Sequence, residues 1–282
     1  MSASRFLPRL ALALSLSSLL ASLAVGRAHA AQDERDVTRM VSFGGMCVKC
    51  ELSGRKLTGA RFMGANFAGA TLVGSDLRGA SFFGSNFSNA DLSRADLRGA
   101  SMMGATFILA NFSEATLDGL QAKGAVFMNA NLTGARFESA EMEGANFIRA
   151  DAHGASFNNA SLMGVNFTGA RLERASFRNA DLQGVVFTGG AMTGADFKDA
   201  DLEHAMLGGA DLSGVKNLTQ DQVDEACADA STRLPAGLVG RACRGRVVVV
   251  HARHHMAPPA PPAPPAPPAA PVAPRHFVGA DE

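Results

Sequence analysis

Residues 90–109 read ADLSRADLRGASMMGATFIL, in which an apolar residue stands at every fifth position, beginning with Leu92. The same spacing continues without insertion or deletion through 33 centres, from Leu52 to Leu212. We number each five-residue word so that this centre is position 3. Position 1 is Ala in 25 of the 33 words and position 5 is Gly in 21. Because five matches neither the helical period nor the strand period, the pattern predicts a chain that turns a corner in every word.

Positions 1 and 3 are apolar or small with the one exception of Arg55, and we expect them to face inward, whereas polar residues at positions 2 and 4 face solvent. Position 5 is expected to be a corner with positive φ, which Gly adopts without a clash of Cβ. Where Gly is missing, residues that tolerate this conformation often replace it. They are Asn89, Asn129, Asn159, Asn179 and Asp199.

A second period of 20 residues indicates four words per coil, with like side chains stacked on one side. The predicted core ladder is Phe67, Phe87, Phe107, Phe127, Phe147, Phe167 and Phe187. Fourteen of the 18 Phe residues occupy centres, so we interpret them as core and not as a ligand site. The alanine centres Ala122 and Ala152 are expected to leave locally under-filled layers.

Words such as Ala95-Asp96-Leu97-Arg98-Gly99 and Ala65-Asn66-Phe67-Ala68-Gly69 resemble those of the pentapeptide repeat proteins. The resemblance implies an all-β solenoid, namely a right-handed, four-sided parallel β-helix. Thirty-three words at four per coil make about eight coils, and strands about 4.8 Å apart give a rod roughly 40 Å long. We expect residues 52–215 to form this rod.

Residues 1–30 are typical of a secretory signal. Arg5 and Arg9 precede an apolar run, and an Ala-x-Ala-like site places cleavage between Ala30 and Ala31. An uncleaved anchor is the alternative, although the run is short for a membrane span of about 20 residues. The mature protein is expected to be exported, periplasmic or secreted, with no membrane span.

Residues 31–51 are expected to form a lead-in and N-terminal cap that contains Cys47 and Cys50 on the repeat lattice. A zinc site lacks a second pair of ligands nearby, and a thioredoxin-like pair lacks a βαβ context. We therefore predict a structural disulfide or two buried thiols. Cys227 and Cys243 lie at the far end of the rod, too distant to pair with Cys47 or Cys50. The predicted pairs are Cys47–Cys50 and Cys227–Cys243.

Residues 216–250 are predicted to form a C-terminal cap with a helix at about residues 220–230 and a short strand at residues 247–250. Thr219 and Gln222 make a capping box. Val223, Ala226, Cys227 and Ala230 share one helical face. This helix is expected to cover the last coil, as helix caps do in many proteins of the resembling family.

Residues 251–282 are expected to be a disordered basic and proline-rich tail, with ten prolines between residues 258 and 274. This composition favours extended polyproline II that acts as a spacer or as a ligand for aromatic grooves. A metal site is the alternative for His251, His254 and His255, but we favour a solvated basic segment because no fold is predicted to fix the three side chains.

The formal net charge of zero, with 18% charged residues, points to no electrostatic partner of either sign. The only histidines of the repeat, His153 and His204, are 51 residues apart, which is not a multiple of 20. We predict no catalytic residue, cofactor or metal, and interpret the chain as an exported, non-enzymatic scaffold or protein-interaction rod. Its partner is expected to be a protein and not a nucleic acid.

The alternative is a DNA mimic that regulates a topoisomerase such as gyrase, which some pentapeptide repeat proteins are. That function needs a strongly acidic rod in the cytoplasm. Residues 52–215 hold 13 Lys and Arg against 16 Asp and Glu, a net charge of only −3. The charge and the export signal both disfavour the alternative. The oligomeric state is left open by the sequence.

The export signal generates a first prediction. N-terminal sequencing of the mature protein is expected to begin at Ala31 or within a few residues of it, because the Ala-x-Ala-like site ends at Ala30. Intact Met1 in a soluble cytoplasmic fraction would contradict export and favour the topoisomerase alternative.

Overall fold

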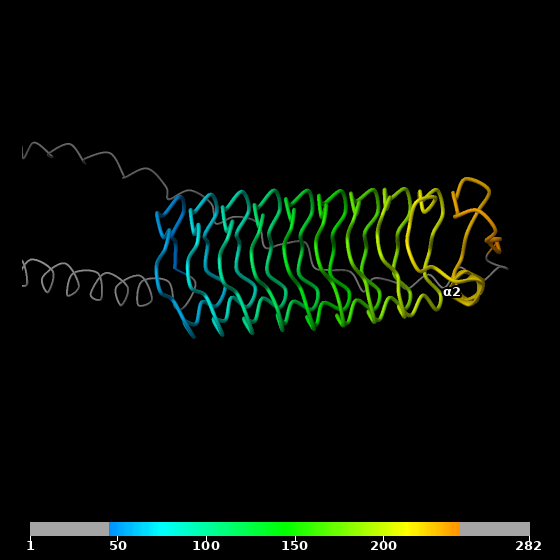
Figure 1. Cartoon of the computed structure of the whole chain (residues 1–282). Helices are drawn as coiled ribbons and strands as arrows, with labels where there is room; N and C mark the ends of the chain where they lie inside the picture. The colour runs from blue at the N-terminus through cyan, green and yellow to red at the C-terminus, as the bar shows by residue number, and fades with distance from the viewer. Residues whose placement is uncertain (1–44, 243–282) are drawn as a thin grey trace, which may run out of the picture. The chain divides into compact units, whose positions relative to one another are not determined.

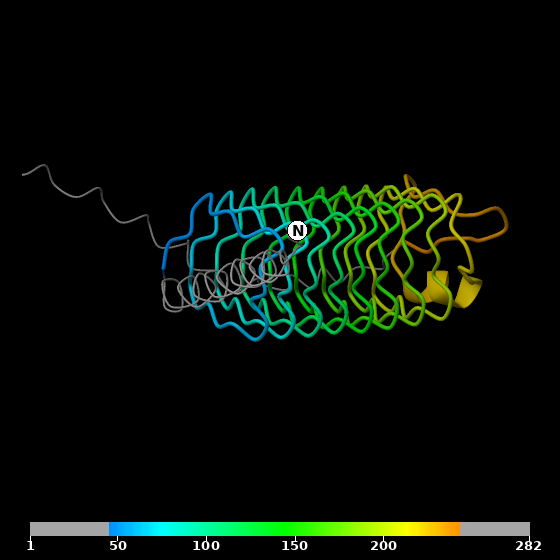
Figure 2. The same cartoon turned by 60° about the vertical axis from the view of Figure 1, so that its left-hand side comes forward.

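The structure is a computed structural model that describes residues 45–242. Within these residues the backbone winds into a rod of stacked coils, coloured from blue to orange in Figure 1 and turned by 60° in Figure 2. The predicted signal segment with Ala30 and Ala31, most of the lead-in, Cys243, the strand at residues 247–250 and the tail lie outside the described residues.

The β-structure of the rod consists of isolated parallel bridges, each one residue long. The bridges recur at position 2 of every word, and from Met46 to Lys216 each joins a residue to the one 20 positions later, as in Asn66 with Asn86. Four words therefore make one coil, as the second period predicted. We name each side by one of its centres: the Phe127, Leu132, Phe137 and Met142 faces, in chain order.

Hydrogen bonds between coils use most backbone groups of a word. In the word of residues 145–149, Phe147 N–H donates to Asn166 O at 2.7 Å in the next coil. Asn146 N–H donates back to Ala125 O at 2.9 Å in the previous coil. The N–H at position 5 also reaches the next coil. Since almost every word repeats these bonds, the 20-residue register is fixed along the whole rod.

The corner accounts for the remaining donors of a word whose position 2 is Asn or Asp. Ala150 N–H closes a turn onto Phe147 O at 3.0 Å, and Ile148 N–H donates to the Asn146 side chain at 3.0 Å. This second bond explains why Asn and Asp recur at position 2. Position 5 has positive φ, as predicted, at its glycines except Gly214 and at the Asn and Asp replacements. Arg, Glu, Ser, His and Leu adopt the same conformation in other words.

The core contains the residues of positions 1 and 3. The predicted Phe ladder forms one stack, in which ring centroids lie between 4.6 and 5.5 Å apart. A second stack runs from Phe137 to Phe197 and meets the first edge-on, for example 6.4 Å from Phe127 to Phe137. Edge-to-face contacts between stacked columns suit the ring quadrupoles and fill the rod.

The two alanine centres differ in their surroundings. Ala122 follows Leu120, a large residue at position 1 that is fully buried, whereas Ala152 follows the small Ala150. Leu120 places apolar volume beside the small centre and offsets part of the volume missing at Ala122. An under-filled layer therefore stays a prediction for Ala152 in particular.

Helix α2 spans Gln220–Glu225 and is shorter than predicted. Thr219 and Gln222 do form the capping box, and Val223 is buried. The expected extension to Ala230 is wrong, because Ala226 is extended and Cys227 forms a parallel bridge to Met206. Cys227 N–H donates to Ala205 O, so pairing with the last coil replaces a further helical turn.

The slot assignment generates a prediction with a matched control. Phe127→Ala is expected to destabilise the rod by about 3–5 kcal/mol, because a fully buried ring leaves a cavity between its stacked neighbours. Phe83→Ala removes the same side chain from position 4, where it is 50% exposed, and is expected to cost less than about 1 kcal/mol. Equal shifts in denaturant melts would show that the slots are misassigned.

Candidate functional site

The C-terminal edge of the rod is the place where the repeat stops and the backbone of the last coil must find other partners. Two faces continue by bridges, Met206 with Cys227 and Asp211 with Arg233. Helix α2 lies over the remaining part of the edge (Figure 1). The edge is thus closed partly by strand pairing and partly by side chains.

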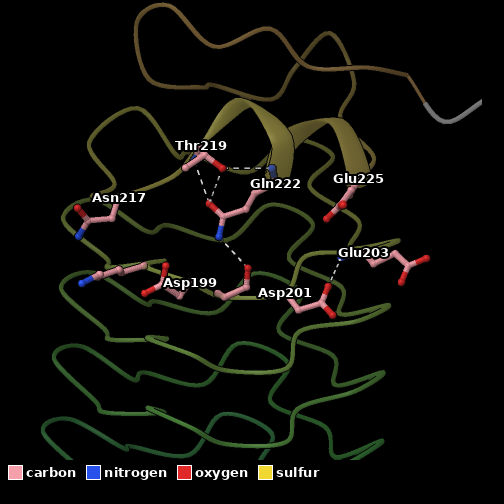
Figure 3. Close-up of a pocket in the computed structure, with 9 residues that line it drawn as sticks. Asp199, Asp201, Glu203, Asn217, Thr219, Gln222 and Glu225 are labelled. Carbon is pink, nitrogen blue, oxygen red and sulfur yellow. Dashed lines mark hydrogen bonds between the residues drawn. The ribbon is translucent and has the colours of Figure 1, made fainter.

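Gln222 of α2 closes the edge with its side-chain amide. Its Nε2 donates to Ala200 O at 2.7 Å and to Phe197 O at 2.9 Å, and Figure 3 shows Gln222 on the side of α2 that faces the last coil. In regular coils a position 1 carbonyl accepts a backbone N–H of the next coil, as Ala180 O does from Asp201 at 3.0 Å. The Gln222 amide therefore replaces the backbone donor of a coil that does not exist.

The other end of the same amide holds the start of the helix. Gln222 Oε1 accepts the N–H of Thr219 at 2.9 Å, and Thr219 Oγ1 accepts the N–H of Gln222 at 3.3 Å. Because one side chain binds both the helix terminus and the last coil, α2 is fixed in position over the rod.

The side chain of Asp229 also replaces a backbone group of a missing coil. Its carboxylate accepts Gly209 N–H at 3.1 Å, where a carbonyl of the next coil would otherwise stand. The Ser231 hydroxyl and then the Gly209 N–H lower the pKa of Asp229 to about 2. A Cβ at Gly208 would lie 2.8 Å from this carboxylate, so a larger residue there would have to displace the Asp229 side chain.

A shallow groove lies between the last coil and α2 (Figure 3). Four carboxylates line it, together with Lys198. They are Asp199, Asp201, Glu203 and Glu225. Asp201 is held by Gln183, whose Nε2 donates to Asp201 Oδ2 at 2.6 Å. Among the described residues, no group of three His, Cys, Asp or Glu side chains is placed to hold a metal ion.

The cysteines lie at the two ends of the rod. Cys47 and Cys50 form a disulfide with Cα atoms 5.2 Å apart, and Cys47 is buried at a centre position of the first coil. Cys227 is disulfide-bonded and also belongs to the bridge to Met206. Cys243 lies outside the described residues, so its pairing with Cys227 stays a prediction.

Outward side chains form ladders along the faces. On the Leu132 face, Asn131 Nδ2 donates to Asn111 at 3.1 Å, and Asn111 Nδ2 donates to Asp91 at 3.0 Å. On the Phe137 face, Arg78 bridges Asp76 at 2.7 Å and Asp96 at 3.7 Å. The hydrogen bond from Arg78 lowers the pKa of Asp76 below its ordinary value. The faces thus differ in chemistry while sharing one backbone geometry.

Sequence reasoning did not find the edge roles of Gln222 and Asp229. It identified Gln222 only as part of a capping box. Asp229 and Ser231 repeat the spacing of Asp211 and Ser213, where Asp211 accepts the Ser213 N–H and hydroxyl. That spacing was the available signal that residues 227–233 continue the pattern of the coils.

The pentapeptide repeat family model matches the chain in successive segments that together cover residues 47–216. Since this is more than half of the 282 residues, the chain belongs to the pentapeptide repeat family. Its rod is a pentapeptide repeat β-helix. The comparison with curated proteins found no match. No helix among residues 45–242 is long and apolar enough to cross a membrane.

Three solved structures are among those similar to this chain. HetL, a pentapeptide repeat protein involved in heterocyst differentiation regulation from the cyanobacterium Nostoc sp. strain PCC 7120, is 25% identical over 67% of this chain and 92% of HetL, with a TM-score of 0.36. QnrB1, a plasmid-mediated fluoroquinolone resistance protein, is 22% identical over 66% of this chain and 91% of QnrB1, with a TM-score of 0.42. A pentapeptide repeat protein from the Arabidopsis thaliana thylakoid lumen is 29% identical over 46% of this chain and 66% of its own chain, with a TM-score of 0.20. The TM-scores are all below 0.5, so the family assignment rests on the repeat itself.

The closure of the edge generates the next prediction. Gln222→Ala is expected to loosen the cap by about 1–3 kcal/mol, because Ala200 O loses its donor and the capping box is broken. Hydrogen exchange at the amides of His204 and Leu207, which pair with residues 225 and 227, measures this opening. The amide of Phe147 in the middle of the rod serves as the internal reference.

The matched control for this prediction is Asp221→Asn, an exposed position one residue away in the same helix. It leaves the amide of Gln222 in place and is expected to change exchange by less than about 0.5 kcal/mol. Unchanged protection in Gln222→Ala would show that the glutamine does not close the edge.

Proposed function

We propose that this protein is an exported, non-enzymatic rod that binds a partner protein through its side faces. The observation that carries this proposal is the ordering of the outward side chains. Positions 2 and 4 of consecutive coils stack at the strand spacing of about 4.8 Å, on a backbone whose hydrogen bonds are made within the rod. Such a surface is preorganised, so binding sacrifices little conformational freedom.

Export is supported by two features of the chain. Residues 1–30 have the pattern of a secretory signal, and the first coil contains the Cys47–Cys50 disulfide, which is typical of oxidising compartments. Within this proposal the β-helix is right-handed, as in the family, and residues 251–282 serve as a proline-rich spacer.

The topoisomerase alternative receives little support from the charges on the Phe137 face. A duplex mimic needs uniform negative charge, because the phosphates it replaces all carry the same sign. Arginines on this face alternate with acids instead, as in the Arg136–Asp118 and Arg78–Asp96 pairs. This arrangement favours a protein partner with its own mixture of charged and polar groups.

The proposal is tested by substituting one outward residue on each of the four faces of a single coil and measuring binding of the partner protein. The mature protein and four single variants serve as baits in extracts of the exported compartment. Each variant places arginine at position 4 of a different face: Met128→Arg, Thr133→Arg, Glu138→Arg or Glu143→Arg. A specific partner is expected to be lost with one variant and retained with the other three, all of which should melt like the parent protein.

Two outcomes would contradict the proposal. Capture that is equally strong with all four variants would mean that no side face is the binding surface. Recovery of the native protein from the cytoplasm in complex with a topoisomerase would contradict the exported role.

A further inference from the structure

The Phe127 face differs from the other three faces in charge. Its outward slots are positions 2 and 4 of the eight words centred every 20 residues from Phe67 to Leu207. None of these 16 slots, all within the described residues, holds a charged residue. The corresponding slots of the other three faces hold a charged residue in 24 of 50 cases. The outward slots of these eight words are therefore uncharged, and the charges nearest to them include Arg149 at the corner beside Ile148 and Asp229 beside Gly209 at the C-terminal edge.

The middle of this face is apolar. Ile108, Met128 and Ile148 stack at position 4 of three successive coils, and Val126 bridges at position 2 between Thr106 and Asn146. All of these outward side chains are partly accessible to solvent. A monomeric rod gains nothing from a continuous apolar strip in water, so the strip points to a contact surface.

Leu109 adds an independent observation at the corner beside Ile108. It is 57% exposed and has a φ of 60°. It is the one apolar residue among the non-glycine positions with positive φ in the described residues. A leucine in this conformation is strained and an exposed leucine is poorly solvated, so the position is unfavourable on both counts. The presence of a leucine here is explained if its side chain makes a contact with another molecule.

The face is large enough for a stable interface. Eight coils at about 4.8 Å make it roughly 40 Å tall, and three extended residues with their flanking side chains make it about 15–20 Å wide. The area of one face is thus about 600–800 Å². Two such faces in contact would bury about 1,200–1,600 Å² in total, which is within the range of specific complexes.

We propose that the Phe127 face is the interface through which two copies of this chain associate side by side. Outward slots without charge meet their copies without repulsion between like charges, whereas a charged partner surface would lose hydration there without gaining an opposite charge. Both copies also share the same spacing along the rod, so their outward side chains can interdigitate over its length. A two-fold contact of this kind is the commonest arrangement in oligomers.

This inference rests on the proposed role as a non-enzymatic interaction rod, and a matched pair of variants tests it separately from that role. Val126→Glu puts a charge at position 2 of the Phe127 face, and Thr116→Glu puts it at position 2 of the opposite Phe137 face. Both residues bridge neighbouring coils and are of similar size. Sedimentation of the mature protein over a range of concentrations measures self-association.

The parent protein and Thr116→Glu are expected to dimerise alike, whereas Val126→Glu, alone or with Met128→Glu, weakens the dimer at least about tenfold, because a charge is buried without a partner. Melts of dilute protein check that each variant folds. A parent protein that stays monomeric at every concentration, or a dimer that survives both glutamates, would overturn the proposal. A monomeric Val126→Glu that still captures its partner protein would leave the proposed function intact.

Leu109→Gly provides a second test with readouts of opposite sign. Glycine relieves the positive φ, so the dilute monomer should melt at a higher temperature. Loss of the exposed side chain should at the same time weaken the dimer. If Leu109→Gly gains stability and dimerises as before, Leu109 makes no contact in the dimer. If Thr116→Glu weakens the dimer as much as Val126→Glu does, the interface does not lie on the Phe127 face.

Discussion

Hydrogen bonding between coils is the constraint on which the rest of this molecule depends. From Met46 to Lys216 each bridge joins residues 20 positions apart, so any change in the length of one word would shift the register of every later coil. This explains why 33 words follow one another without insertion. It also explains why the core can be so uniform, since residues in the same slot must stack on one another. The Phe stacks are a consequence of the register as much as a cause of stability.

The same constraint decides which residues are free to vary. Positions 1 and 3 fill the core, and position 5 must tolerate a positive φ. Position 2 favours Asn or Asp, because its side chain accepts the N–H of position 4, as Asn146 does from Ile148. Chemical variety is therefore confined to the outward slots. A protein of this construction acquires function by the pattern of its faces, and the charges of this chain are distributed very unevenly among them.

Most of the rod could be predicted from the sequence, because its period is imposed by local geometry that every word repeats. The end could not be predicted to the same depth. Val223, Ala226, Cys227 and Ala230 fit a helical face, yet only Val223 belongs to α2. Cys227 pairs with the last coil because that coil offers Ala205 O and Leu207 N–H, and the availability of these groups is invisible in a local pattern. The roles of Gln222 and Asp229 were missed for the same reason, since each replaces a backbone group of a coil that is absent.

The closure of the C-terminal edge and the uncharged side face are connected. A solenoid can grow along its axis through unpaired strand edges, and that route leads to open fibres. Here Gln222 Nε2 and the Asp229 carboxylate occupy groups that an incoming coil would need at this end. With axial pairing blocked there, a lateral face becomes the favourable surface for association. Of the four sides, only the Phe127 face can be buried against a copy of itself without desolvating charges in its outward slots. The edge chemistry and the charge pattern thus favour a closed pair of rods over an open stack.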